Sequence, residues 1–166
     1  MSLDHKAYFF DWRSFSTEML PWFRDALARS DCNSFYAFVL SNRDYCRSPY
    51  EGEPLGAGWE KEVDVNDLQQ LADFALTKYY DPSQNRGLSA MWIELDDTLS
   101  PELKKTLTGF AIEGFDPGLQ GSYFLTPEDA RSYAKMLQTT SNVLAREYGQ
   151  FLECAANGSR GVYITF

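Results

Sequence analysis

The C-terminal segment, residues 126–166, constrains the fold more than any other part of this sequence. Its first residues, 126–129 (TPED), combine a hydroxyl side chain for capping, a proline for the first helical position and acids for the first turn. Apolar residues then recur at helical spacing at Ala130, Tyr133, Leu137, Leu144, Tyr148, Phe151 and Ala155. After two glycines, residues 162–166 (VYITF) have the β-branched and aromatic composition of a strand. We therefore predict a long C-terminal helix, or two helices in line because residues 139–142 are poor helix sequence, followed by a terminal strand.

The remaining sequence alternates helical and strand patterns. Helices are predicted over residues 14–29, from Asp64 or Asn66 to Tyr79, and from Ser100 to about Phe110. Strands are predicted over residues 34–40 (SFYAFVL), 88–95 and 123–125. This mixture favours a single globular domain, residues 1–166, of the α+β or mixed α/β class. We expect a small sheet of about four or five strands covered by about four or five helices.

The charge balance restricts the kinds of partner. The chain has 24 Asp and Glu against 15 Lys and Arg, a formal net charge of -9. Such a field repels phosphate-rich polymers, so we expect no nucleic-acid partner. No stretch approaches the roughly 20 apolar residues of a membrane helix, and the first residues have no signal-peptide core. We expect a cytoplasmic protein that does not bind membranes.

The motifs of common enzyme classes are incomplete. His5, the single histidine, lies near a terminus that we expect to be mobile, so we do not assign it as a general base. Residues 87–91 (GLSAM) begin like a nucleophile elbow but lack its closing glycine. Neither glycine-rich stretch, 56–58 or 114–121, matches a nucleotide-binding fingerprint, and the three cysteines form no C-x-x-C pair. We predict no catalytic residue and no cofactor.

One acidic cluster supports an alternative, enzymatic interpretation. Glu94, Asp96 and Asp97 follow or end the predicted strand 88–95, where α/β proteins place ligand sites. Carboxylates there could hold a divalent cation or perform acid–base chemistry, as in a small carboxylate-dependent or metal-dependent enzyme. The competing interpretation, which we favour, is a solvated acidic turn before the helix cap at Ser100.

A second acidic region is denser and contains aromatic residues. Between residues 51 and 67 six acids are offset only by Lys61, in a loop rich in proline and glycine. Aromatic anchors rimmed by like charges are typical of surfaces that bind an oppositely charged protein. The candidate partner-binding residues are Tyr45, Tyr50, Glu51, Glu53, Trp59, Glu60, Glu62 and Asp64. The opposing interpretation is a solvated loop whose Trp59 folds back onto the core.

The N-terminal pattern, a helix ending in FRDALARS followed by FYAFVLS, resembles small acidic immunity proteins of bacterial polymorphic toxin systems, as does the later segment AMWIEL. This resemblance implies a protein that occludes the active site of a cognate toxin, and it assigns no catalytic residue. With the charge pattern, it leads us to predict a non-enzymatic protein-binding module, an inhibitor or immunity-type protein with a basic protein partner. A structural homodimer subunit that uses its aromatic surface is a third interpretation.

Overall fold

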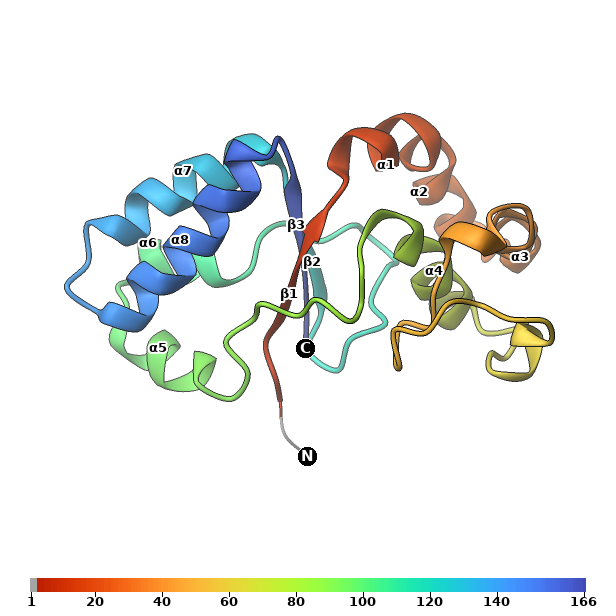
Figure 1. The fold of residues 1–166 in the computed structure, drawn as a ribbon, viewed down its shortest axis with the longest axis horizontal. Coiled ribbons are helices and arrows are strands. Elements are labelled where there is room, and N and C mark those ends of the chain that lie inside the picture. The colour runs from red at the N-terminus through yellow and green to blue at the C-terminus, as the bar shows by residue number, and fades with distance from the viewer. Residues whose placement is uncertain (1–2) are drawn as a thin grey trace.

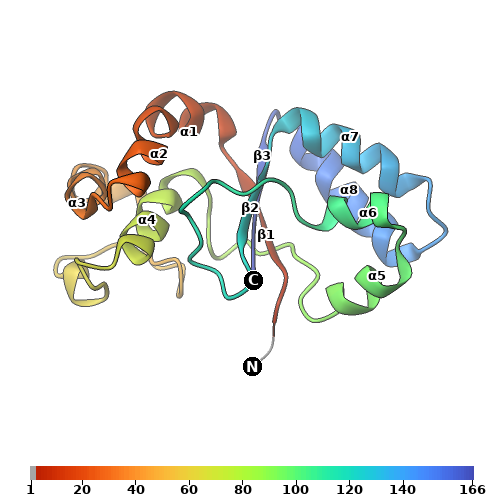
Figure 2. The same cartoon turned by 180° about the vertical axis from the view of Figure 1, so that it is seen from behind.

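The computed structural model describes residues 3–166 as a small central sheet with helices on both sides (Figures 1 and 2). The strands are β1 (Lys6–Phe10), β2 (Ser122–Leu125) and β3 (Gly161–Thr165). Their order is β1-β3-β2, and both pairs are antiparallel. Tyr163 on the central strand lies opposite Tyr8 on one side and Phe124 on the other. The chain is therefore of the α+β class, and its sheet has three strands among the described residues, fewer than predicted.

The helices divide into two groups. One side of the sheet carries α1 (Trp12–Glu18), α2 (Leu20–Ala28), α3 (Cys32–Ser41) and α4 (Leu68–Leu76). The other carries α5 (Trp92–Thr98), α6 (Pro101–Lys104), α7 (Pro127–Gln138) and α8 (Val143–Asn157). The described residues also form four single-turn 3-10 helices in the segments between or after these helices: η1 (Arg43–Tyr45), η2 (Trp59–Lys61), η3 (Thr77–Tyr79) and η4 (Lys105–Leu107).

Alternation along the strands explains this layering. Tyr8, Phe10, Phe124 and Tyr163 face the α1–α4 side, whereas Ala7, Leu125, Val162 and Ile164 face the α7–α8 side. The outer edges of the sheet are covered: the Arg86 amide donates to the Ala7 carbonyl oxygen beside β1, and Phe110 pairs with Phe124 beside β2. Covering both edges removes the backbone groups that would otherwise pair with another chain.

Two predicted strands are wrong, because residues 34–40 are helical and the second half of 88–95 lies in α5. The Asp31 carboxylate accepts a hydrogen bond from the Ser34 amide and begins α3, and Phe35 and Val39, four residues apart, are both buried. In the second segment Leu95 and Leu99 are buried at the same spacing, while Met91 and Ile93 are exposed. The short aromatic runs have the composition of strands, but tertiary packing decides their conformation.

The C-terminal helices are not in line but antiparallel, since the chain reverses at residues 139–142. A capping box between Thr126 and Asp129 begins α7, and the Asn142 side chain accepts from the Ala145 amide to begin α8. Gly149 lets the two helices approach closely, because a Cβ atom there would lie 3.0 Å from the Leu137 Cβ. The predicted strands 123–125 and 162–166 are confirmed as β2 and β3.

Candidate protein-binding surface

The acidic segment occupies residues 43–67 and runs from α3 along α4, drawn in orange to yellow in Figure 1. It contains seven Asp or Glu and three Lys or Arg, so it contributes a large share of the net charge of -9. We call residues 43–67 the acidic segment from here on.

Backbone contacts hold the first part of the acidic segment in a defined shape. Cys46 and Leu55 are buried, and the Leu55 amide donates to the Cys46 carbonyl oxygen at 3.3 Å. The Arg47 amide donates to Thr77 Oγ1 at 2.9 Å, which attaches the segment to η3. Gly52, at φ +75°, closes the tip by donating to the Ser48 carbonyl oxygen. The tip, residues 48–53, is therefore ordered before any partner arrives, which lowers the entropic cost of binding.

The aromatic residues of the tip and of η1 face solvent. Tyr45 is 70% exposed and Tyr50 is 65% exposed. Glu51, Glu53 and Glu62 are exposed and Glu60 is half-buried. Within residues 3–166 no lysine or arginine forms an ion pair with any of these four glutamates. The acidic segment thus presents two tyrosine rings together with unneutralised carboxylates.

Trp59 does not belong to this surface. Its side chain is 1% exposed and packs against Tyr36 and Phe74, with ring centroids 5.6 and 6.1 Å away. Gly58, at φ +84°, turns the chain so that η2 directs the indole into the core. The folded-back interpretation is correct for Trp59, and its assignment as a partner-facing anchor is wrong.

The end of the acidic segment has a structural role. Asp64 Oδ1 accepts a hydrogen bond from the Asn66 amide at 2.9 Å and stabilises a turn. Asp67, and neither Asp64 nor Asn66, caps α4 by accepting from the amides of Gln69 and Gln70. The candidate surface therefore consists of Tyr45, Tyr50, Glu51, Glu53, Glu60 and Glu62.

The alternative acidic cluster lies on a helix and not at the end of a strand. Glu94, Asp96 and Asp97 lie on α5 and do not follow a strand, so the reason for expecting a ligand there is wrong. Asp96 is paired with Lys104 at 3.3 Å. Throughout residues 3–166, no group of three His, Cys, Asp or Glu side chains is arranged to hold a metal ion.

His5 is a buried structural residue, not part of a mobile terminus. Its Nε2 lies 2.7 Å from the Leu107 carbonyl oxygen, and its Nδ1 accepts from the Leu88 amide at 3.2 Å. Both contacts suit a neutral imidazole with its proton on Nε2. Burial lowers the pKa of His5 to about 4, so the ring stays neutral at physiological pH.

Sequence reasoning missed an acid in the core. Asp73 on α4 is only 9% exposed, and its neighbours Ala72 and Phe74 are fully buried. Its carboxyl group forms no hydrogen bond or ion pair with the described residues. Burial raises the pKa of Asp73 to about 7, and the charge of Lys6 opposes this shift. The signal was available, because a charged residue inside the apolar run LADFAL is out of pattern.

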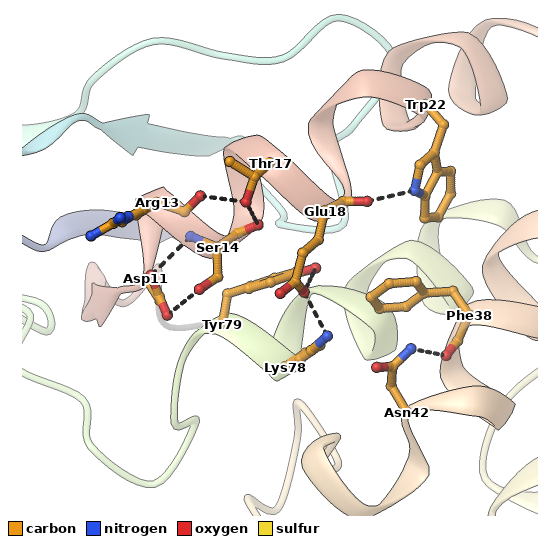
Figure 3. A network of polar contacts seen from close by, with 10 residues as sticks. All are labelled: Asp11, Arg13, Ser14, Thr17, Glu18, Trp22, Phe38, Asn42, Lys78 and Tyr79. Atoms are coloured by element: carbon orange, nitrogen blue, oxygen red, sulfur yellow. Dashed lines mark hydrogen bonds and ion pairs between the residues drawn. The ribbon is translucent and has the colours of Figure 1, made fainter.

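A polar network near α1 stabilises the fold. Glu18 accepts from Lys78 Nζ at 2.6 Å and from the Tyr79 hydroxyl at 3.2 Å, which joins α1 to η3 (Figure 3). A cavity of about 500 Å³ beside it is lined by Arg13, Lys78 and Arg160 among others. A second cavity of about 670 Å³ lies between α2 and the loop 111–114. The lining of neither cavity contains a histidine or a cysteine.

Comparison of the chain with protein-family models, with curated proteins and with solved structures gives no match. Among residues 3–166, no helix combines the length and the apolar character needed to cross a bilayer.

Proposed function

We propose that this chain is a non-enzymatic protein-binding module, an inhibitor or immunity-type protein that occludes a basic protein partner through the acidic segment. The observation that carries the proposal is the pairing of two exposed rings, Tyr45 and Tyr50, with glutamates that no cation of the described chain neutralises. Monomeric proteins expose single apolar residues routinely, but ordered aromatics among unpaired like charges are typical of binding surfaces.

The two kinds of side chain have separate roles in this proposal. The glutamates raise the rate of encounter with a basic surface, because their attraction acts over about 8–10 Å at physiological ionic strength. The tyrosines provide buried contact area at little conformational cost, since each has two side-chain torsions. The ordered tip, residues 48–53, presents Tyr50 without a large rearrangement.

The resemblance to immunity proteins supports this proposal less strongly than the sequence pattern suggested. It depended on FYAFVLS as a strand, and these residues form the greater part of α3. The immunity-type role therefore rests on the charge and the exposed rings of the acidic segment.

The proposal is tested by isolating the partner from cells that express the protein and comparing two charge variants. Glu51→Gln, Glu53→Gln and Glu62→Gln together should weaken the complex at least about tenfold, as charged rims and hot spots do. The matched control replaces three exposed acids elsewhere, Glu102, Glu113 and Glu128, and removes the same charge. Equal affinities for the two triple variants, or a partner that is not basic, would overturn the proposal.

A further inference from the structure

The cavity of about 500 Å³ beside α1 lies at the end of the sheet where β1 leads into α1 and α8 leads into β3 (Figure 1). Its lining residues include three cations, Arg13, Lys78 and Arg160, and one acid, Asp11. Positive charge therefore predominates in this cavity, although the whole chain has a net charge of -9. The volume lies within the range of small-molecule sites, about 300–1,000 Å³. A ligand that fits this cavity should be a small anion.

Two of the four charged residues already have partners within the fold. Oδ1 of Asp11 accepts a hydrogen bond from the Ser14 amide at 3.0 Å, and Oδ2 accepts from the Ser14 hydroxyl at 2.7 Å, so this carboxylate caps α1 (Figure 3). Lys78 Nζ donates to the Glu18 carboxylate at 2.6 Å. Both charges therefore support the fold, and an incoming anion would depend chiefly on the two arginines.

The two arginines have no acidic partner. Within residues 3–166, neither the Arg13 nor the Arg160 guanidinium forms an ion pair or a hydrogen bond. Figure 3 shows the Arg13 side chain extending away from Lys78, with no dashed line at its guanidinium. The Arg160 guanidinium lies 5.7 Å from the ring centroid of Phe9, which also lines the cavity. A guanidinium presents five N–H donors in a planar fork that matches phosphate oxygens, so both forks remain available to a ligand.

Local packing fixes the position of Arg160. Its amide donates to the Ala155 carbonyl oxygen at 2.8 Å, as in a Schellman motif at the end of α8. Phe9, whose ring carries the guanidinium, packs in turn on Phe151 with ring centroids 5.0 Å apart. A guanidinium that is held before binding loses less conformational entropy when the ligand arrives.

The second cavity, of about 670 Å³, provides a contrast. Its lining contains one cation, Arg24, and two acids, Asp25 and Glu113. Negative charge therefore predominates there, and the cavity should not attract an anion. The larger volume alone does not make it a site for the same ligand.

We propose that the cavity beside α1 binds the phosphate group of a small molecule through Arg13 and Arg160. A phosphate group carries nearly two negative charges at neutral pH and has oxygens for both guanidinium forks, whereas a carboxylate has one charge and two oxygens. The net charge of -9 repels a polymer of phosphates, so the ligand is a small molecule. This inference goes beyond the proposed function, which concerns the acidic segment, and does not depend on it.

The test titrates three probes into isotope-labelled protein at constant ionic strength: inorganic phosphate, phenyl phosphate and benzenesulfonate. The Nε signals of Arg13 and Arg160 and the amides of residues 158–160 are followed by NMR at about pH 7.5, where phosphate is mostly doubly charged. Both phosphate probes should give saturable shifts, with dissociation constants on the order of millimolar. Benzenesulfonate, which carries one charge, should bind about tenfold more weakly. Tighter binding of phenyl phosphate than of inorganic phosphate identifies an organic ester, and equal binding identifies the free ion; either result supports the site.

Three arginine variants make the result specific. Arg13→Gln and Arg160→Gln should each weaken binding of phenyl phosphate about tenfold, because each removes a charge-assisted contact. The matched control, Arg24→Gln, removes the same charge from the second cavity and should leave the dissociation constant unchanged. All three side chains are exposed, so the variants should fold.

Three results would overturn the inference: no saturable shift with either phosphate probe, equal affinity for benzenesulfonate, or equal weakening by Arg24→Gln and Arg160→Gln. None of them involves the acidic segment, so the proposed function would stand or fall separately on its own charge variants.

Discussion

The two sides of the sheet are built from different side chains. On the α1–α4 side the core is aromatic: Phe15 alone contacts Phe10, Phe23, Tyr79 and Phe124. On the α7–α8 side it is aliphatic, with alanines such as Ala134 and Ala155 facing leucines in a close helical hairpin. Among the Asp, Glu, Lys, Arg and His residues of the described chain, each side buries one, Asp73 on the aromatic side and His5 on the aliphatic side.

These two groups differ in whether the protein satisfies them. His5 has a partner for both ring nitrogens, whereas the Asp73 carboxyl group has none among the described residues. On the aliphatic side the imidazole is therefore paired, although the buried Tyr148 hydroxyl has no hydrogen-bond partner among the described residues. The aromatic side carries both the exposed tyrosines of the acidic segment and the buried acid Asp73. We infer that the aromatic side binds and the aliphatic side stabilises.

The largest effect on stability is expected for Trp59, which was a candidate surface anchor in the sequence and is buried in the structure. Trp59→Ala should lower the free energy of unfolding by about 3–5 kcal/mol, because it empties the space between Tyr36 and Phe74. Tyr45→Ala, at an exposed position, should change it by no more than about 0.5 kcal/mol. Urea unfolding of both variants measures the difference, and similar values for the two would contradict the assignment of Trp59 to the core.

Asp73→Asn, unlike Trp59→Ala, should raise the free energy of unfolding above neutral pH. The pKa of Asp73 is 3.8 when unfolded and about 7 when folded, so the unfolded state binds fewer protons between these values. The free energy of unfolding therefore falls as pH rises from about 4 to about 7, by up to about 4 kcal/mol. Urea unfolding at several pH values should show this decline for the original chain and not for the variant. A variant less stable than the original chain at pH 8 would indicate that Asp73 supports the fold.

His5, on the aliphatic side, should make the free energy of unfolding depend on pH in the opposite direction and by a smaller amount. Its pKa is 6.5 when unfolded and about 4 when folded, so the unfolded state binds more protons between these values. The contribution of His5 to the free energy of unfolding is therefore fully present above pH 6.5. It decreases by up to about 3 kcal/mol as the pH falls to about 4. His5→Gln keeps a donor and an acceptor that do not titrate and should flatten this range. If the pH dependence persisted unchanged in His5→Gln, another group would be responsible.

Local signals predicted the C-terminal elements better than the aromatic side. The helix start at residues 126–129 and the strand predicted over residues 162–166 depend on neighbours in sequence, and patterns recover such elements. The reversal between α7 and α8 was missed, because poor helix sequence at 139–142 indicates an interruption but not its direction. Helix pairing is a tertiary property.

On the aromatic side the decisive contacts are distant in sequence. Residues 35–41 form a helix because Phe35 and Val39 pack into a core completed by other segments, although Asp31 was a readable cap. Trp59 is buried through Tyr36 and Phe74, and no local pattern distinguishes that from an exposed anchor. The sequence therefore indicated the exposed residues Tyr45 and Tyr50, but it left the position of Trp59 open.

Association kinetics with the purified basic partner test the central claim most directly, that the acidic segment is the binding surface. The account predicts that Glu51→Gln, Glu53→Gln and Glu62→Gln together slow association and flatten its salt dependence, while dissociation changes little, because rim charges act through long-range attraction. The control with Glu102, Glu113 and Glu128 replaced should keep the original rate. An association rate and salt dependence unchanged in the first variant would contradict the account and leave the acidic segment a solvated surface.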